Sequence, residues 1–298
     1  MIGPNRPGRR THVGHSAPKT GLSVNVSPSG TVQISTKRPL GAGARGPVTR
    51  CYHRAVIACY GKDLTSGRMS GSHQYVVMPS FSTIKVLLAA TFWRAVAAGE
   101  LSEARPYAFQ PWQAVGGAGV LHGFRHAAQL ALADYLHLAL VVSDNDATNV
   151  VIAFVGFERV AALAAELGLR DTALRRQMMD WEAAAAGRDN VTCARDLATL
   201  LEQLVAGDAR IGATACENVL TSLAVQEHRD GLGRALPAGA AYSGKPGDDL
   251  PEGRFCHDCG VVTTPDGHTL VLAVLTDGED GYDAVAAAGR RLYDELAG

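Results

Sequence analysis

Residues 79–90 read PSFSTIKVLLAA, a short polar turn that leads into an apolar helix. The Ser80 hydroxyl is placed to cap this helix, which can extend to a stop at Gly99. Ser82 and Lys85 are three positions apart, so they share one face of the helix. The helix dipole favours negative charge in the first turn, and a serine there can attack a carbonyl if a neutral amine accepts its proton. An ordinary helix start, with a lysine that reaches to solvent, is the alternative that this tetrad alone leaves open.

Two further motifs follow along the chain. Ser143-Asp144-Asn145 comes after the apolar run 135–142, and Lys245-Pro246-Gly247 precedes a strand hairpin near the C-terminus. Ser-x-x-Lys, Ser-Asp-Asn and Lys-Thr-Gly in this order are the signature of class A β-lactamases and penicillin-binding proteins. From about Tyr52 to the C-terminus the chain resembles that superfamily. The resemblance implies an acyl-serine enzyme whose site lies between a sheet domain and a helical domain.

The resemblance also implies a role for each motif residue. Ser82 is the expected nucleophile, and Lys85 is the expected base. Ser143 is expected to relay a proton to the leaving group, with Lys245 as the cation that lowers its pKa. Asn145 is expected to hold the amide of the substrate. No metal ligand and no cofactor is expected.

The third motif is also expected to help bind the oxyanion. The two donors would be the backbone N–H groups of Ser82 and of Asp248, the residue after Gly247. Here the chain departs from the family pattern, because Pro246 replaces the threonine whose hydroxyl binds the substrate carboxylate. Proline has neither a hydroxyl nor a backbone N–H.

Charged residues after the third motif bear on the substrate. Asp248 and Asp249 add negative charge beside the expected carboxylate site, and Arg254 is the residue that could compensate for it. A neutral or cationic acyl donor fits two aspartates better than a typical penicillin does.

Class A β-lactamases carry a glutamate between the second and third motifs, with an asparagine four residues later, and together these hold the hydrolytic water. Trp181-Glu182 fits the start of this pattern, but Ala186 stands at the asparagine position. Glu182 is therefore either the water-activating base or a surface glutamate on a helix, and the alanine run 183–186 favours the second. Without that base, an acyl-enzyme reacts slowly with water or passes its acyl group to another nucleophile.

Composition excludes several classes of partner. The 298 residues carry a net charge of −1 with 19% charged residues and no long basic stripe, so no nucleic-acid partner is expected. No apolar run reaches the roughly 18 residues of a membrane span, so no membrane association is expected. No apolar core follows the N-terminal arginines, which predicts a cytoplasmic protein, or a secreted one if the true N-terminus differs. A small-molecule acyl substrate remains as the expected partner.

The order of elements predicts an α/β (α+β) fold, an antiparallel sheet flanked by helices with an inserted all-helical domain. Residues 1–46 are expected to form a mostly irregular leader, 47–78 and 212–298 the sheet domain, and 79–211 the insertion. Strands are expected at 30–36, 54–60, 69–77, 240–245, 259–264 and 269–275. Besides the helix that begins at Ser80, helices are expected at 127–142, 147–155, 158–167, 175–186, 194–205, 213–224 and 282–296.

These observations favour a serine hydrolase of the class A β-lactamase-like family that forms an acyl-enzyme on Ser82 and cleaves an amide, β-lactam or ester bond. One alternative is a cytosolic transacylase or peptidase-like biosynthetic enzyme on the same fold, which the missing export signal supports. A second alternative is a non-catalytic binding or sensor module. The intact set of motif side chains argues against the second alternative, because a pure binder needs no such set.

Overall fold

The computed structural model describes residues 22–26, 32–36, 55–278 and 280–298. The chain divides into two compact units, residues 1–52 and residues 53–298. In the first unit, β1 (Leu22–Val26) pairs with β2 (Val32–Thr36) as an antiparallel hairpin, and β2 lies within the predicted strand 30–36. The rest of the predicted leader falls outside the described residues.

The second unit is built around a five-stranded sheet in which every neighbouring pair is antiparallel. The strand order is β4-β3-β11-β10-β9, so β4 and β9 form its two edges. This arrangement confirms the predicted mixed α/β fold with an antiparallel sheet. The strands are β3 (Val56–Asp63), β4 (Met69–Ser72), β9 (Ala241–Asp248), β10 (Phe255–Thr263) and β11 (Thr269–Asp277).

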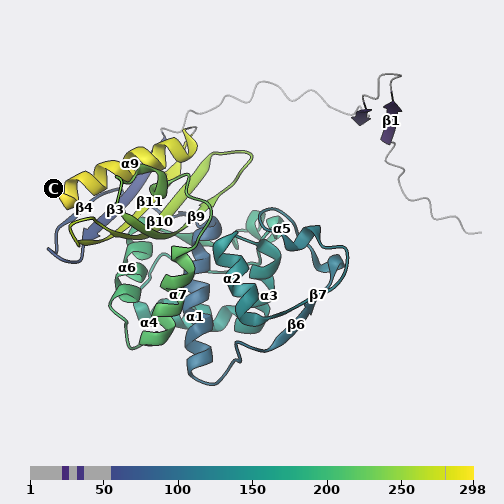
Figure 1. Cartoon of the computed structure of the whole chain (residues 1–298), viewed down its shortest axis with the longest axis horizontal. Helices are drawn as coiled ribbons and strands as arrows, with labels where there is room; N and C mark the ends of the chain where they lie inside the picture. Colours follow the sequence, from purple (N-terminus) through teal and green to yellow (C-terminus); the bar gives the residue numbers. More distant parts are fainter. Residues whose placement is uncertain (1–21, 27–31, 37–54, 279) are drawn as a thin grey trace, which may run out of the picture. The chain divides into compact units, whose positions relative to one another are not determined.

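The two faces of the sheet are covered by different helices (Figure 1). Side chains alternate between the faces along each strand. On β11, residues 270, 272 and 274 belong to the core shared with α8 (Leu232–Ala235) and α9 (Gly281–Ala297), whereas 271, 273 and 275 belong to the core shared with the other helices. The sheet therefore has an α9 face and a face that points toward the helical part of the unit.

The helical part is organised around α1 (Lys85–Ala97), which contacts α2, α3, α4 and α7. Every residue from 83 to 92 is buried, so the first two turns of α1 are enclosed on all sides. Each large apolar side chain buried in this way contributes roughly 1.5–3 kcal/mol, and this packing fixes the end of α1 where Ser82 lies. The neighbouring helices are α2 (Leu132–Val141), α3 (Asn145–Val155), α4 (Phe157–Leu167), α5 (Trp181–Ala185), α6 (Ala194–Val205) and α7 (Ala213–Ala224).

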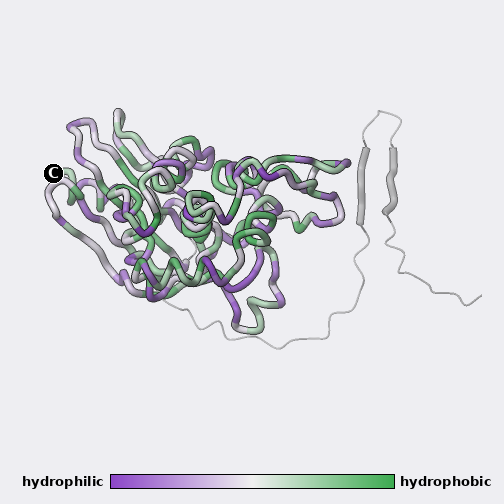
Figure 2. Tube along the Cα trace, turned by 90° about the horizontal axis from the view of Figure 1, so that it is seen from below, coloured by the Kyte–Doolittle hydropathy of each residue, from purple (hydrophilic) through white to green (hydrophobic). Residues whose placement is uncertain are grey.

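Hydropathy along the chain agrees with these layers. In Figure 2 the colour changes repeatedly between apolar and polar along the helices and strands of the second unit, as expected of segments with one buried and one exposed face. Within the described residues, no helix combines the length and the apolar composition needed to cross a membrane.

Two predicted helices were wrong over part of their length. Residues 128–131 form β7 (Ala128–Ala131), which pairs with β6 (Pro106–Phe109), and only then does α2 begin. In the predicted helix 175–186, only α5 is α-helical, and residues 175–180 form a bend and a turn. The short strand β5 (Met78–Pro79), which comes just before the Ser82 turn in the sequence, pairs with β8 (Val191–Thr192). Residues 53–298 form one compact unit, so the division into sheet and inserted domains stays a prediction.

Candidate active site

Ser82 lies in a single 3₁₀ turn, Phe81–Ile84, that leads directly into α1. The predicted cap by the Ser80 hydroxyl was wrong, because no hydrogen bond from that side chain caps the turn. Instead, the Ser80 carbonyl accepts two hydrogen bonds from Thr83, one from the backbone N–H at 3.2 Å and one from the side-chain hydroxyl at 2.6 Å. The Ser82 residue in this turn is partly exposed.

The Ser143 hydroxyl is the centre of the hydrogen-bond network. It donates to Ser82 Oγ at 2.9 Å, and it accepts from Lys85 Nζ at 3.2 Å and from Lys245 Nζ at 3.0 Å. The structure therefore brings together the serine of the first motif, the serine of the second and both lysines. A proton that leaves Ser82 can reach either amine through Ser143.

Both lysines are completely buried. Burial, followed by the positive charge of the other lysine, holds the pKa of Lys85 well below its ordinary value. Burial also lowers the pKa of Lys245 to about 8, although the negative charges of Asp258 and Asp248 oppose this shift. Lys85 is thus the group whose environment best favours the neutral amine that a base must be.

The second motif is held in a strained conformation. Ser143 has φ +57°, a region that non-glycine residues rarely adopt. Asp144 caps α3 through its carboxylate, which accepts from Ala147 N at 2.8 Å. Asn145 accepts from Lys85 Nζ at 3.1 Å and donates to Gly116 O at 3.2 Å. The side-chain amide of Asn145 thereby joins the lysine to a loop at the site.

The third motif lies on β9, an edge of the sheet. Asp249 N bonds to Phe255 O, so by alternation the next hydrogen-bonded pair is Gly247 with His257. The N–H of Asp248 between them therefore points away from β10, toward the open edge. Pro246 occupies the equivalent outward position, where the missing N–H costs no ladder hydrogen bond.

Gly247 brings this edge against the nucleophile turn. A Cβ at this position would lie 2.6 Å from Ser82 N and 2.9 Å from Thr83 N. Only a residue without a side chain permits such an approach. The outward N–H of Asp248 and the N–H of Ser82 therefore belong to neighbouring backbone segments, as an oxyanion site requires.

The charged residues after the motif are directed elsewhere. Asp248 accepts from the hydroxyl of Tyr282 on α9 at 2.6 Å, and Asp249 accepts from Phe255 N at 2.9 Å. Arg254 forms a two-point ion pair with Asp277, at 2.5 and 2.9 Å. Arg254 therefore pairs with Asp277, and strand alternation turns the Asp248 side chain toward α9. The negative charge of Asp248 still acts on Lys85 and Lys245, and its effect on a substrate carboxylate stays a prediction.

Glu182 lies on the exposed first turn of α5. Its carboxylate has no hydrogen bond or ion pair with any residue that the structure describes. The Lys85 amine bonds only to Ser143 and Asn145 within the same residues, and so to no carboxylate. Glu182 therefore has no contact with the hydrogen-bond network of Ser82, and a surface helix glutamate is the prediction that its exposure favours.

His257 is a residue of the site for which sequence analysis gave no role. It is fully buried on β10, and its ring lies 5.7 Å from that of Phe81, the residue before the nucleophile. The signal that could have identified it was its alternation with Cys259, which places it on the sheet face turned toward the helices.

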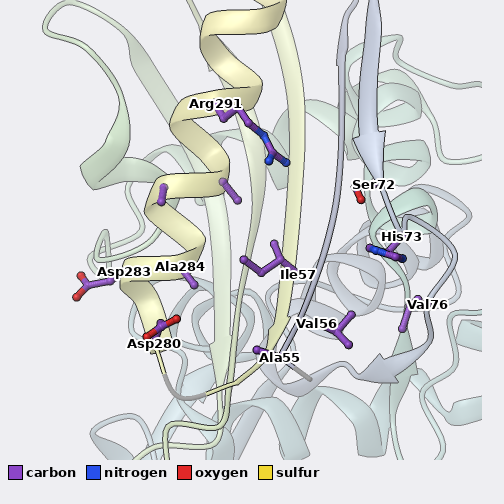
Figure 3. Close-up of a pocket in the computed structure, with 12 residues that line it drawn as sticks. Ala55, Val56, Ile57, Ser72, His73, Val76, Asp280, Asp283, Ala284 and Arg291 are labelled. Carbon is purple, nitrogen blue, oxygen red and sulfur yellow. The ribbon is translucent and has the colours of Figure 1, made fainter. Parts of the chain in front are cut away.

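A separate hollow of about 840 Å³ lies at the opposite edge of the sheet, between α9 and the strands β3 and β4 (Figure 3). Figure 3 shows Arg291 of α9 reaching toward the strands, with Ser72 at the end of β4 and His73 after it on the other side of the hollow. None of the residues around this hollow belongs to the network of Ser82.

Comparison with known proteins identifies the family. The model of the β-lactamase enzyme family matches residues 50–296. The chain belongs to this family. A β-lactamase regulatory protein, BlaB of Streptomyces cacaoi, is 28% identical to it over 287 residues, which cover 79% of this chain and 91% of that protein.

Solved structures show the same relationship. A β-lactamase from Sphaerobacter thermophilus is similar at a TM-score of 0.74 and 28% identity, covering 81% of this chain and 92% of that one. PBP-A is similar at a TM-score of 0.74 and 26% identity, covering 81% and 89%. The class A β-lactamase from Mycobacterium abscessus, at 20% identity and a TM-score of 0.75, shares the fold, with coverage of 82% and 95%.

Proposed function

We propose that this member of the β-lactamase family is an acyl-serine enzyme that attacks an amide, β-lactam or ester carbonyl with Ser82 and loses the acyl group slowly to water. The observation that carries the proposal is the hydrogen-bond chain from Ser82 Oγ through Ser143 Oγ to the two buried lysines. A hydroxyl linked through a second hydroxyl to a desolvated amine can give up its proton and act as a nucleophile.

In the acylation step, Ser82 Oγ forms an ester bond to the carbonyl carbon. Its proton passes through Ser143 to the neutral Lys85 amine, and the electron pair of the broken bond stays on the leaving group. Ser143 then returns a proton to the leaving group, with Lys245 beside it. The N–H groups of Ser82 and Asp248 stabilise the oxyanion that forms in between.

Slow deacylation is proposed because no carboxylate bonds to Lys85 among the described residues. Hydrolysis of the ester needs a base that activates water. Glu182 is the carboxylate that the family pattern suggests for this step, and it lies on the exposed face of α5. One relative agrees with an adduct that lives long enough to be observed. A PBP-A variant with a leucine-to-glutamate substitution was solved as an acyl-enzyme complex with penicillin G.

The test is incubation with benzylpenicillin, nitrocefin and a fluorophosphonate, followed by intact mass spectrometry. We expect a stable adduct with at least one donor that is lost in Ser82→Ala and kept in Ser102→Ala, which changes an exposed loop serine. Rapid nitrocefin turnover with no accumulated adduct would contradict slow deacylation. The absence of an adduct with every donor would contradict acyl transfer and favour a binding or sensor module.

A transacylase remains the second candidate, because a slowly hydrolysed acyl-enzyme can pass its acyl group to an amine or alcohol. It is distinguished by adding amino acids or simple alcohols to the preformed adduct. Release of an acylated acceptor faster than release into buffer would support it.

A further inference from the structure

His257 connects the two backbone segments that line the expected oxyanion site. We propose that His257 is a positioning residue that ties the Ser82 turn to strand β9, and so sets the Ser82 and Asp248 N–H donors relative to each other. The proposal rests on the acyl-enzyme function proposed above, and it assigns a role to a residue outside the three motifs.

The side chain of His257 holds the entrance to the nucleophile turn. Its Nε2 lies 2.9 Å from Pro79 O, and its Nδ1 lies 3.2 Å from Thr276 N. A carbonyl oxygen can only accept and a backbone N–H can only donate, so the ring carries its hydrogen on Nε2 and is neutral. Burial also lowers the pKa of His257 to about 4, which agrees with a neutral ring near pH 7.

The backbone of His257 holds the other segment. It pairs with Gly247 in the hydrogen-bonded register of β9 and β10. Gly247 lies directly against Ser82 N, and the next residue, Asp248, directs its N–H to the open edge. One residue therefore contacts β9 through its main chain and the Pro79 carbonyl through its ring.

The turn needs such support because it contains an unfavourable conformation. Phe81, between Pro79 and Ser82, has φ +45°. Its ring packs 5.6 Å from Phe255 and 5.7 Å from His257, measured between centroids. Loss of the His257 hydrogen bond would let the turn relax toward an ordinary backbone conformation and would move the Ser82 N–H away from its working position.

The test compares two substitutions at His257 with a matched control. His257→Phe keeps an aromatic ring but removes both hydrogen bonds, whereas His257→Gln keeps an N–H that can reach Pro79 O. Val261→Ala is the control, because Val261 lies on the same face of the same strand and packs in the same core. The readouts are the maximal acylation rate constant and the apparent Kd for a fluorescent penicillin, or for the fluorophosphonate if that is the reactive donor.

We expect His257→Phe to lower the maximal acylation rate by about 100-fold, the usual effect of losing an oxyanion donor, with little change in apparent Kd. His257→Gln should recover part of the rate, and Val261→Ala should acylate almost as the unmodified protein does. Unchanged acylation in His257→Phe would overturn the proposal. An equal loss in Val261→Ala would also overturn it, because the effect would then be general destabilisation.

A second measurement tests the proposal even if the variants do not fold or the protein does not form an acyl-enzyme. Nitrogen-15 NMR of the unmodified protein at pH 7 should show the His257 ring, assigned through its contact with the Thr276 amide, as the neutral form with hydrogen on Nε2. A ring protonated on Nδ1, alone or in the cationic form, would refute the connection to Pro79. If no donor gives an adduct while the ring has the expected form, the proposed function fails and the connection itself stands.

Discussion

Ser143 Oγ donates to Ser82 Oγ at 2.9 Å, and this contact joins a residue of the bend before α3 to the turn before α1. Because both lysine amines bond to Ser143, the contact also links the nucleophile to the two cations. In the proposed mechanism, activation of Ser82 therefore depends on Ser143.

Removal of the Ser143 hydroxyl should slow acylation. Ser143→Ala keeps the Cβ at the same strained position but breaks the path from Ser82 to the amines. We expect the acylation rate constant to fall about 10²- to 10⁴-fold, the usual range for a lost acid–base group. Time-resolved mass spectrometry of the adduct measures this rate. Ser102→Ala is the control, and a Ser143→Ala rate within twofold of the unmodified protein would exclude Ser143 as the relay.

Lys245 should impose a stability cost that depends on pH. Its pKa is about 8 in the folded state and 10.5 in the unfolded state, so the unfolded chain binds more protons between these values. The free energy of unfolding should therefore rise with pH from 8 to 10.5, and below pH 8 the cost is constant at about 3 kcal/mol.

Lys245→Met should consequently unfold less readily at pH 7, by about 1–3 kcal/mol, while acylation is lost. Urea denaturation at pH 7 and at pH 9.5 measures the gain, which should shrink at the higher pH. Lys62→Met removes a partly exposed lysine paired with Glu202 and should give no gain. A Lys245→Met protein less stable than the original at pH 7 would show that the lysine is a net stabilising group.

Neutralising Glu182 should leave the acyl-enzyme unchanged. The carboxylate is exposed and lies outside the hydrogen-bond network of Ser82. We expect Glu182→Gln to release the acyl group at the same rate as the unmodified protein, measured by the decay of the adduct mass after removal of excess donor. A lifetime lengthened about 10-fold or more would restore Glu182 as the base that activates water.

A methyl group at position 247 should separate the sheet edge from the nucleophile turn. In Gly247→Ala the new Cβ would meet backbone nitrogens at 2.6 and 2.9 Å, so the segments must move apart. We expect a loss of about 1–3 kcal/mol in unfolding free energy and a fall in acylation of about 100-fold. Thermal unfolding and adduct formation measure the two effects.

Gly123→Ala is the matched control for this substitution, because a Cβ at Gly123 would have no neighbour within 4 Å. Both properties should stay close to those of the unmodified protein in the control. Gly247→Ala with unchanged acylation would mean that the close approach at Ser82 is unimportant for the oxyanion site.

Local pattern was sufficient for elements whose partners are close in sequence or whose faces are clearly amphipathic. Helices α6 and α7 have the predicted bounds, because an apolar stripe and flanking turn residues specify where a helix begins and ends. Residues 127–131 have a helical pattern too, yet residues 128–131 became β7, because their partner β6 lies about 20 residues earlier in the chain. Such a pairing cannot be inferred from periodicity alone.

The amino-acid sequence by itself determined the family, the mixed α/β fold with an antiparallel sheet, and the motif side chains that meet at Ser82, since three motifs carry them. Only the tertiary structure decided that Ser143 bonds to both lysines, that Asp248 and Arg254 bind Tyr282 and Asp277, and that His257 holds the nucleophile turn. The physical reason is that spacing along a chain specifies which face of an element a side chain occupies, whereas its partner on that face comes from a distant segment placed by packing of the whole core.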